Sequence, residues 1–357
     1  MRSAAALITY WNFFEQTDNT SDKKMTNKNL IIFDMDGVIV DVSGSYRDVV
    51  RQTSRTFFQP AAGWGKLPDP LFELSDLAAV KQSGGLNNDW DLTFAIINLL
   101  FSLIGRPAAA AGRDPWTKWA QTLNRCDVTA IGDYLAATAQ PLATLLDQKG
   151  RLQDDRVASF YKGDVGSGNI IKQIFQEIYL GQDLFKHTYR LEPKVYRGEG
   201  YILREKVLIG RPLLEMLGRD NILAIATGRP RAEAEYPLRH FDLKKYFEVV
   251  YTLDDCLEEE KRILALKGRK VSLSKPHPFM LDAIADGLKE KFDDRYYVGD
   301  MPDDMLAAAN SRRGFKSIGI VLSAPDQFSL RNDLKRAGAD YLIENFVELE
   351  KIVLGPP

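Results

Sequence analysis

Residues 29–41 read NLIIFDMDGVIVD, and this stretch decides the fold. Its apolar run at 30–33 ends in two carboxylates one residue apart, Asp34 and Asp36, and Gly37 follows. An apolar run bounded by charge and glycine predicts a strand that is buried on both faces, as in a parallel sheet. Because ligands bind at the carboxyl ends of strands in an open α/β sheet, both aspartates are candidate site residues.

The two aspartates would share one face of the strand if it continued through them, because side chains alternate in direction along a strand. Such a pair can bind a divalent cation, or it can divide the work between an ionised nucleophile and a protonated acid. The alternative interpretation is an acidic turn in which Gly37 is simply the turn residue. Motifs elsewhere in the chain favour the first interpretation.

Three further motifs follow the first motif, DMDGV at 34–38, at long intervals: ATGRP at 226–230, SKPHP at 274–278 and GDMPDD at 299–304. Together they resemble the four motifs of the haloacid dehalogenase superfamily of phosphohydrolases. The subgroup that the chain resembles most is that of phosphoglycolate phosphatases and β-phosphoglucomutases, whose helical cap also follows the first motif. The resemblance runs from Leu30 to the region of Asp340, although the middle third carries no motif of the family.

The hydrophobic pattern predicts where the sheet and the helices lie. Strands that alternate with helices imply a parallel sheet with right-handed crossovers. Between residues 60 and 204 the pattern is helical only, with one long helix predicted at 131–148. The predicted strands are 30–33, 222–226, 247–251, 296–299, 316–322 and, as a sixth candidate, 341–343.

We therefore expect an α/β fold: a Rossmann-like core with a parallel sheet, interrupted by a large all-helical cap. The core would comprise residues 28–41 and 205–357, and the cap would comprise residues 42–204. Residues 1–27 are predicted to be a flexible extension, and whether residues 1–24 belong to the natural protein stays open, because Met25 offers a second start.

Composition excludes several classes of protein. A net charge of −2, from 47 basic and 49 acidic residues, gives no reason to expect a nucleic-acid surface. The longest apolar stretch, residues 92–104, is shorter than the roughly 20 residues that span a bilayer. Two distant cysteines, Cys126 and Cys256, fit a reducing cytosol. We predict a cytoplasmic protein whose partner is a small molecule, with no membrane or nucleic-acid partner.

Cleavage of a phosphate monoester needs a nucleophile, a proton donor and groups that neutralise the phosphoryl charge. Asp34 is the natural nucleophile, as the resemblance also implies, and Asp36 would protonate the leaving group and then activate water. Thr227 and the amide of Gly228 would bind phosphoryl oxygens, and Lys275 would hold the charge of nucleophile and phosphoryl group together.

The resemblance also implies a cation site. Asp300 would complete it together with an oxygen of Asp34 and the main-chain carbonyl of Asp36. The family spacing G-D-x-x-x-D selects Asp304 over Asp303 as a further carboxylate, in the outer shell or as a second ligand. Hard oxygen ligands beside a substrate phosphate favour Mg²⁺.

The start of the predicted cap supplies a further substrate-binding candidate. Ser45, Tyr46 and Arg47 stand where the family inserts its cap, so all three are predicted to face the substrate, and Arg47 is predicted to bind it. In the alternative interpretation, Tyr46 belongs to the core and Arg47 is a solvated charge. Arg229 and His277 adjoin the motifs, and for them the surface and the substrate are equally consistent with the sequence.

The sequence thus predicts a Mg²⁺-dependent phosphatase that hydrolyses a small phosphorylated metabolite, such as a sugar phosphate or phosphoglycolate, through an aspartyl-phosphate. One alternative is a phosphomutase of the β-phosphoglucomutase type, which excludes water from the same intermediate. Another is a catalytically silent binding protein of this fold. Neither the substrate nor the oligomeric state can be inferred from the sequence.

Overall fold

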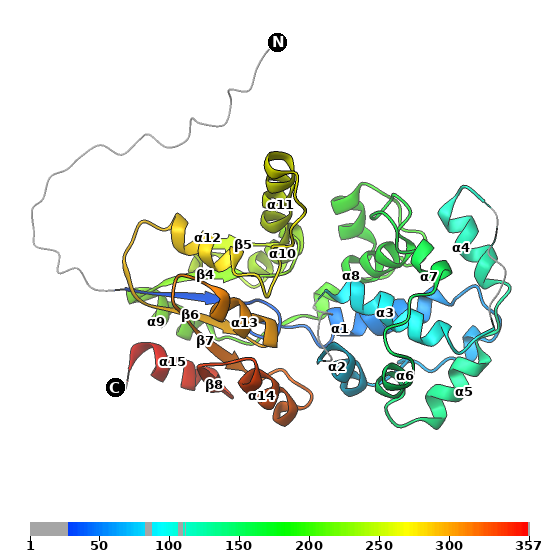
Figure 1. Ribbon diagram of the computed structural model, residues 1–357, viewed down its shortest axis with the longest axis horizontal. Helices are drawn as coiled ribbons and strands as arrows, with labels where there is room; N and C mark the ends of the chain where they lie inside the picture. The colour runs from blue at the N-terminus through cyan, green and yellow to red at the C-terminus, as the bar shows by residue number, and fades with distance from the viewer. Residues whose placement is uncertain (1–27, 83–87, 106–109, 111, 356–357) are drawn as a thin grey trace, which may run out of the picture.

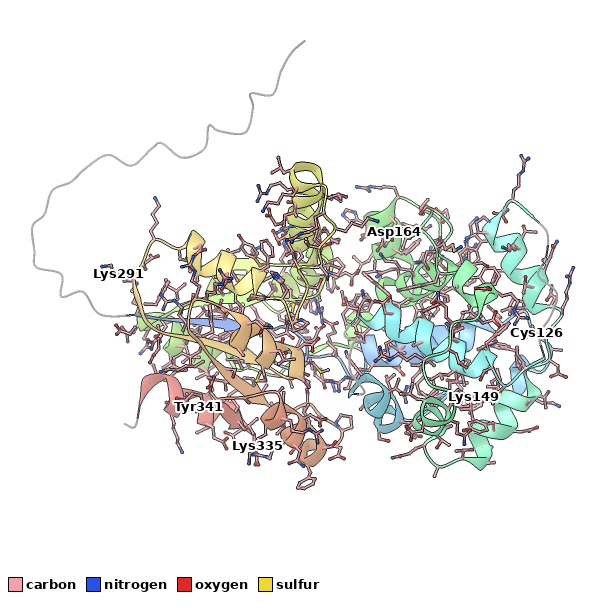
Figure 2. The ribbon with its side chains drawn as sticks, viewed as in Figure 1. Cys126, Lys149, Asp164, Lys291, Lys335 and Tyr341 are labelled. Carbon is pink, nitrogen blue, oxygen red and sulfur yellow. The ribbon has the colours of Figure 1, made fainter. Side chains whose placement is uncertain are left out.

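A computed structural model describes residues 28–82, 88–105, 110 and 112–355 of the chain. Its elements form two lobes (Figure 1): a sheet lobe, which holds strands β1 and β4 to β8 with helices α9 to α15, and a helical lobe of helices α1 to α8. Cys126 and Asp164 mark the helical lobe in Figure 2, and Lys291 and Tyr341 mark the sheet lobe. The extension expected at residues 1–27 lies outside the described residues.

The sheet lobe is built on six parallel strands in the order β5-β4-β1-β6-β7-β8. Strand β1 lies inside the sheet, because Phe33 pairs in register with Ile225 of β4 and with Val298 of β6. This parallel sheet confirms the predicted fold class. The strands are β1 (Lys28–Phe33), β4 (Ile222–Ala226), β5 (Val249–Tyr251), β6 (Phe292–Gly299), β7 (Phe315–Ile320) and β8 (Tyr341–Ile343).

Helices cover both faces of the sheet, which is why β1 reads as an unbroken apolar run. Ile31 and Phe33 pack in one cluster with side chains of α9, α10 and α15, whereas Leu30 and Ile32 pack in another with side chains of α11, α12 and α13. The helices are α9 (Arg211–Asp220), α10 (Arg231–His240), α11 (Leu253–Lys267), α12 (Phe279–Gly287), α13 (Pro302–Asn310), α14 (Gln327–Arg336) and α15 (Phe346–Leu354), with the 3₁₀ helix η3 (Lys244–Tyr246).

The helical lobe holds the elements from α1 to η2, which follow β1 in the chain and precede α9. The helix expected at 131–148 is two helices, because Pro141 begins the second one at its first turn, where the missing amide does no harm. The elements are α1 (Tyr46–Phe57), α2 (Leu74–Gln82), α3 (Asp89–Phe101), α4 (Pro115–Leu123), α5 (Thr129–Ala137), α6 (Pro141–Lys149), α7 (Asp155–Ser159) and α8 (Ile170–Tyr189), with η1 (Trp64–Lys66) and η2 (Tyr201–Arg204).

The chain crosses between the lobes at a small antiparallel pair. Strand β2 (Val40–Asp41) pairs with β3 (Lys206–Val207), and Val40 faces Val207 in register. The chain enters the helical lobe after β2 and leaves it before β3. Both crossings therefore lie side by side, next to the end of β1.

Among the described residues, no helix combines the length and the apolar character that crossing a membrane requires.

Leu30→Ala should lower the free energy of unfolding by about 2–5 kcal/mol, because Leu30 is fully buried in the middle of the sheet. The matched control is Leu266→Ala on α11, where the side chain is 68% exposed and the change should stay within about 0.5 kcal/mol. Urea unfolding followed by circular dichroism measures both. Equal shifts of the two midpoints would contradict the position of β1 in the sheet.

Candidate active site

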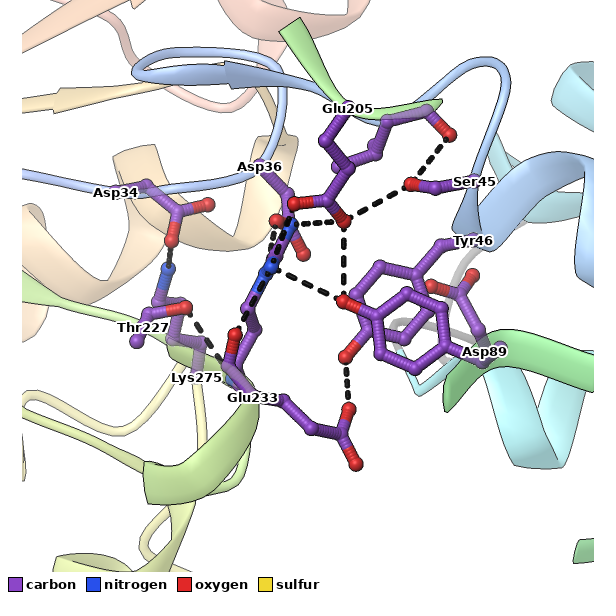
Figure 3. Close-up of polar contacts among 12 residues, drawn as sticks. Asp34, Asp36, Ser45, Tyr46, Asp89, Glu205, Thr227, Glu233 and Lys275 are labelled. Atoms are coloured by element: carbon purple, nitrogen blue, oxygen red, sulfur yellow. Dashed lines mark hydrogen bonds and ion pairs between the residues drawn. The ribbon is translucent and has the colours of Figure 1, made fainter. Parts of the chain in front are cut away.

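The four sequence motifs meet at one edge of the sheet. Asp34 follows β1, Thr227 follows β4 and Asp300 follows β6, and these three strands are neighbours. The carboxyl ends of neighbouring parallel strands lie at the same edge, so the residues that follow them come together. Lys275 reaches this edge from the segment before α12, and its side chain points at Asp34 in Figure 3.

A cavity of about 420 Å³ lies over this edge and is lined by both lobes. The sheet lobe contributes the residues of all four motifs, and the helical lobe contributes side chains from α1, α2 and the start of α3. Asn88 caps α3 by accepting a hydrogen bond from the amide of Trp90. The lining residues used below are Asp34, Asp36, Thr227, Gly228, Lys275, Asp300 and Asp304 from the sheet lobe, and Tyr46, Arg47, Lys81 and Trp90 from the helical lobe.

Lys275 joins two of the carboxylates. Its Nζ lies 2.8 Å from Oδ1 of Asp34 and 2.8 Å from Oδ1 of Asp304. Burial disfavours the charge of Lys275, but Asp304 and Asp34 raise the pKa of its ammonium well above the usual range. Burial raises the pKa of Asp34 to about 8, against the opposing effect of Lys275. The phenol of Tyr297 donates a further hydrogen bond to Asp304, over 2.9 Å.

Three buried carboxylates form a group that fits a divalent cation. Oxygens of Asp34, Asp300 and Asp304 all lie within 4.8 Å of one another. Burial raises the pKa of Asp300 to about 7, against the opposing charge of Arg47. Carboxylate oxygens at this spacing are the hard ligands that Mg²⁺ takes. The side chain of Asp36 is not in this group, so its expected contribution through the main-chain carbonyl stays a prediction.

Gly37 allows the first motif to approach Asp300 closely. Its φ is +74°, a left-handed conformation that side chains disfavour. A Cβ at this position would lie 2.0 Å from Oδ2 of Asp300. Only glycine therefore fits between the first and fourth motifs without displacing the carboxylate.

Thr227 is held in place by the main chain around it. It is buried, its amide donates to the carbonyl of Tyr251 over 3.0 Å, and its hydroxyl oxygen accepts from the amide of Arg229 over 3.2 Å. Gly228 is exposed and lines the cavity beside it. The hydroxyl and the glycine thus line the cavity at the end of β4, the strand next to β1.

The helical lobe brings Arg47 to the carboxylates. One guanidinium nitrogen of Arg47 lies 3.7 Å from Oδ2 of Asp300, and another donates to the carbonyl of Ser323 over 3.2 Å. Tyr46 also lines the cavity, but it is almost fully buried and its ring stacks on Tyr179 at 4.1 Å. Ser45 is fully buried and donates to Glu205 over 3.0 Å, so it lies behind the cavity wall.

The sequence did not predict that Arg229 is buried. Only 2% of it is exposed, and its Nε lies 2.6 Å from Oδ1 of Asp36. His277, in contrast, is exposed, and its Nδ1 accepts the amide of Phe279 at the start of α12. The position of Arg229 directly after the Thr-Gly pair was the one signal in the sequence, because the side chains that it contacts, Asp36, Tyr179 and Glu205, lie 24 or more residues away.

The chain is similar to a family model, to a named relative and to a solved structure. Residues 28–312 match the family model described as haloacid dehalogenase-like hydrolase. A protein of Caldanaerobacter subterraneus subsp. tengcongensis that carries the assigned name pyrophosphatase PpaX is 30% identical over 174 residues, which are 48% of this chain and 68% of the relative. A crystal structure from the Northeast Structural Genomics Consortium covers 92% of this chain and 100% of its own, at 22% identity and a TM-score of 0.60.

The chain belongs to the haloacid dehalogenase-like hydrolases, since the family model covers most of its length. The resemblance drawn from the four motifs is confirmed, and the solved structure supports the same fold.

Gly37→Ala should lower the free energy of unfolding by about 1–2 kcal/mol from the left-handed backbone alone, and the clash with Asp300 adds to this loss. Gly65→Ala is the control, because a Cβ there meets nothing within 4 Å. Urea unfolding curves of the two variants and the wild type give the comparison. If Gly37→Ala were as stable as Gly65→Ala, the close approach to Asp300 would be wrong.

Proposed function

We propose that this hydrolase is a Mg²⁺-dependent phosphatase that acts on a small phosphorylated metabolite through an aspartyl-phosphate on Asp34. The observation that carries the proposal is the ammonium of Lys275, which lies 2.8 Å from both Asp34 and Asp304 at a cavity that also holds Asp300. A cation that pairs with a buried nucleophile can also pair with a phosphoryl group bound against it. This arrangement suits phosphoryl transfer to a carboxylate.

In the first half of the reaction, an oxygen of Asp34 attacks phosphorus and the bond from phosphorus to the leaving oxygen breaks. Asp36 gives its proton to that oxygen. In the second half, Asp36 takes a proton from water, the water oxygen bonds to phosphorus, and the bond to Asp34 breaks. Inorganic phosphate leaves and both aspartates return to their starting states.

The other site residues at this edge of the sheet would bind the phosphoryl group and neutralise its charge. The hydroxyl of Thr227 and the amide of Gly228 would donate to its oxygens, and Lys275 would balance its charge. Asp34, Asp300, Asp304 and the carbonyl of Asp36 would hold Mg²⁺. When bound, the ion supplies charge stabilisation for the phosphoryl oxygens. Arg47 would contact the substrate from the helical lobe.

The size of the cavity favours a small substrate. About 420 Å³ is at the low end of the range for small-molecule sites, and its walls carry the cations Arg47, Lys81 and Lys275. We propose a sugar phosphate or phosphoglycolate as the substrate type. Pyrophosphate belongs in the test panel because a relative carries the name of a pyrophosphatase.

We further propose that residues 42–204 act as a cap domain on a core of residues 28–41 and 205–357. The antiparallel pair β2 and β3, at which both crossings lie, supports this division. We propose the cytoplasm as the compartment, because Cys126 and Cys256 are both free and buried thiols.

Asp34→Asn should abolish phosphate release, with a loss on the order of 10⁴–10⁶ in kcat, because an amide cannot replace the nucleophile. The assay measures phosphate released from sugar phosphates, phosphoglycolate and pyrophosphate, with and without Mg²⁺. The control is Asp293→Asn at an exposed position of β6, which should retain wild-type rates. Turnover by Asp34→Asn, or isomerised sugar phosphates in place of free phosphate, would overturn the proposal.

MgCl₂ should raise the thermal midpoint of the wild-type protein, since an ion that binds only the folded state stabilises it by about 2.7 kcal/mol at 100 times its Kd. Asp300→Asn should lose most of this shift. The quantity to compare is the shift in each protein, because removal of a buried carboxylate changes the starting stability. An equal shift in Asp293→Asn and Asp300→Asn would place the metal elsewhere.

A further inference from the structure

A buried arginine engages the proposed acid and base, Asp36. The side chain of Arg229 is 1% exposed, and its Nε donates to Oδ1 of Asp36 over 2.6 Å. The side chain of Asp36 is 31% exposed and lines the cavity. Among the described residues we find no partner for its other oxygen, Oδ2. One oxygen of Asp36 is therefore fixed from behind, and the other is free to meet a substrate.

A second carboxylate holds Arg229 from the opposite side. The two terminal nitrogens of Arg229 donate to the two oxygens of Glu205, over 3.1 Å and 3.0 Å. Glu205 is fully buried at its side chain, and it also accepts hydrogen bonds from Tyr179 and Ser45, over 3.0 Å each. Figure 3 shows Glu205 joined by dashed lines to Ser45 and to its neighbours in this network.

The planar fork of an arginine suits this arrangement, because it presents donors in two directions at once. Nε and the terminal nitrogens of Arg229 reach two carboxylates simultaneously, which a lysine ammonium on a flexible stem would not reproduce. The carbonyl of Glu233 accepts a further hydrogen bond from Arg229 over 3.2 Å. Arg229 is thus immobilised by partners that are themselves buried.

The partners of Arg229 come from both lobes. Asp36 follows β1 in the sheet lobe, whereas Tyr179, whose hydroxyl accepts a hydrogen bond from a terminal nitrogen of Arg229 over 3.1 Å, belongs to α8 in the helical lobe. Glu205 stands directly before β3, on the segment that returns from the helical lobe. The orientation of Asp36 is therefore tied, through one guanidinium, to the segment that joins the lobes.

We propose that Arg229 is a positioning residue for Asp36: it fixes one carboxylate oxygen so that the other faces the leaving group and later the attacking water, with Glu205 fixing Arg229 in turn. This inference rests on the phosphatase function proposed above. A role in stability alone predicts no selective effect on the steps in which Asp36 moves a proton.

A positioning role and a role in stability alone predict different effects on the two halves of the reaction. p-Nitrophenolate is a stable leaving group, so the attack of Asp34 on p-nitrophenyl phosphate breaks the phosphorus–oxygen bond without a proton from Asp36. Hydrolysis of the aspartyl-phosphate still requires Asp36 to take a proton from water. An enzyme with a misplaced Asp36 should therefore accumulate the aspartyl-phosphate.

The experiment is stopped-flow release of p-nitrophenol by the wild type and by Arg229→Gln. In the variant we expect a burst of one p-nitrophenol per active site at the wild-type rate constant, followed by a steady state slower by roughly 10²–10⁴-fold. With an alkyl phosphate, kcat should fall by a similar factor while KM changes little, because the side chain of Arg229 is 1% exposed and its donors are taken by Asp36 and Glu205. Asp36→Asn should show the same burst and slow steady state. The double variant Arg229→Gln with Asp36→Asn should have a steady-state rate no lower than that of Asp36→Asn alone.

Two further variants separate positioning from folding. Arg229→Gln leaves Glu205 as an unpaired buried charge, so Arg229→Gln with Glu205→Gln removes both charges and should show the same burst. Arg55→Gln in α1 is the control, because Arg55 binds the carbonyl of Pro68 and stacks on Trp64 at 4.4 Å, away from the cavity. It should retain both phases of the wild type.

The outcomes distinguish this inference from the function on which it rests. No p-nitrophenol release by the wild type, or release that survives in Asp34→Asn, would overturn the phosphatase proposal and the positioning role with it. Release that Asp34→Asn abolishes, while the folded Arg229 variants keep wild-type rates or lose both phases in parallel, would overturn the positioning role alone.

Discussion

The site depends on one ammonium group placed between two buried carboxylates. Without Lys275, the like charges of Asp34 and Asp304 would face each other in a setting where burial already disfavours ionisation. Breaking a buried ion pair by removing one partner is costly, whereas the intact pair need not add stability. The ion pair is therefore better explained by catalysis than by stability, because it keeps Asp34 and Lys275 where a phosphoryl group can bind against both of them.

The two aspartates of the first motif are held by different cations from different motifs. Lys275, from the segment before α12, holds Asp34, and Arg229, from the end of β4, holds Asp36. Their side chains are thereby turned to different surroundings, although they are separated by one residue. Asp34 joins the carboxylate group, and Asp36 joins the buried network that reaches Tyr179 in α8. Different surroundings are what two carboxylates need if they are to take different roles.

The sequence predicted strands and helices whose apolar residues recur in a regular pattern. It did not predict elements or contacts that depend on the tertiary fold. Strand β4 has the predicted bounds of 222–226, because its apolar run ends clearly at the Thr-Gly pair that follows it. Helix α11 was missed because its apolar residues do not mark a buried face: Cys256 is its one buried residue, and Leu257, Leu264 and Leu266 are exposed. The motifs placed Asp34, Thr227, Lys275 and Asp300 at one edge. Nothing local could pair Arg229 with Glu205, since only the fold brings them together.

The position of β1 within the sheet has a consequence for how the chain reaches this fold. Strand β1 is the first strand to leave the ribosome, yet its partners β4 and β6 follow only after the whole helical lobe has been synthesised. Pairing between such distant segments is slow, because a long loop must close before any contact forms. An unpaired strand that carries the apolar run at 30–33 is also prone to aggregate before its partner strands have been synthesised. A helical lobe that folds early would bring β2 and β3 together and so shorten the effective loop.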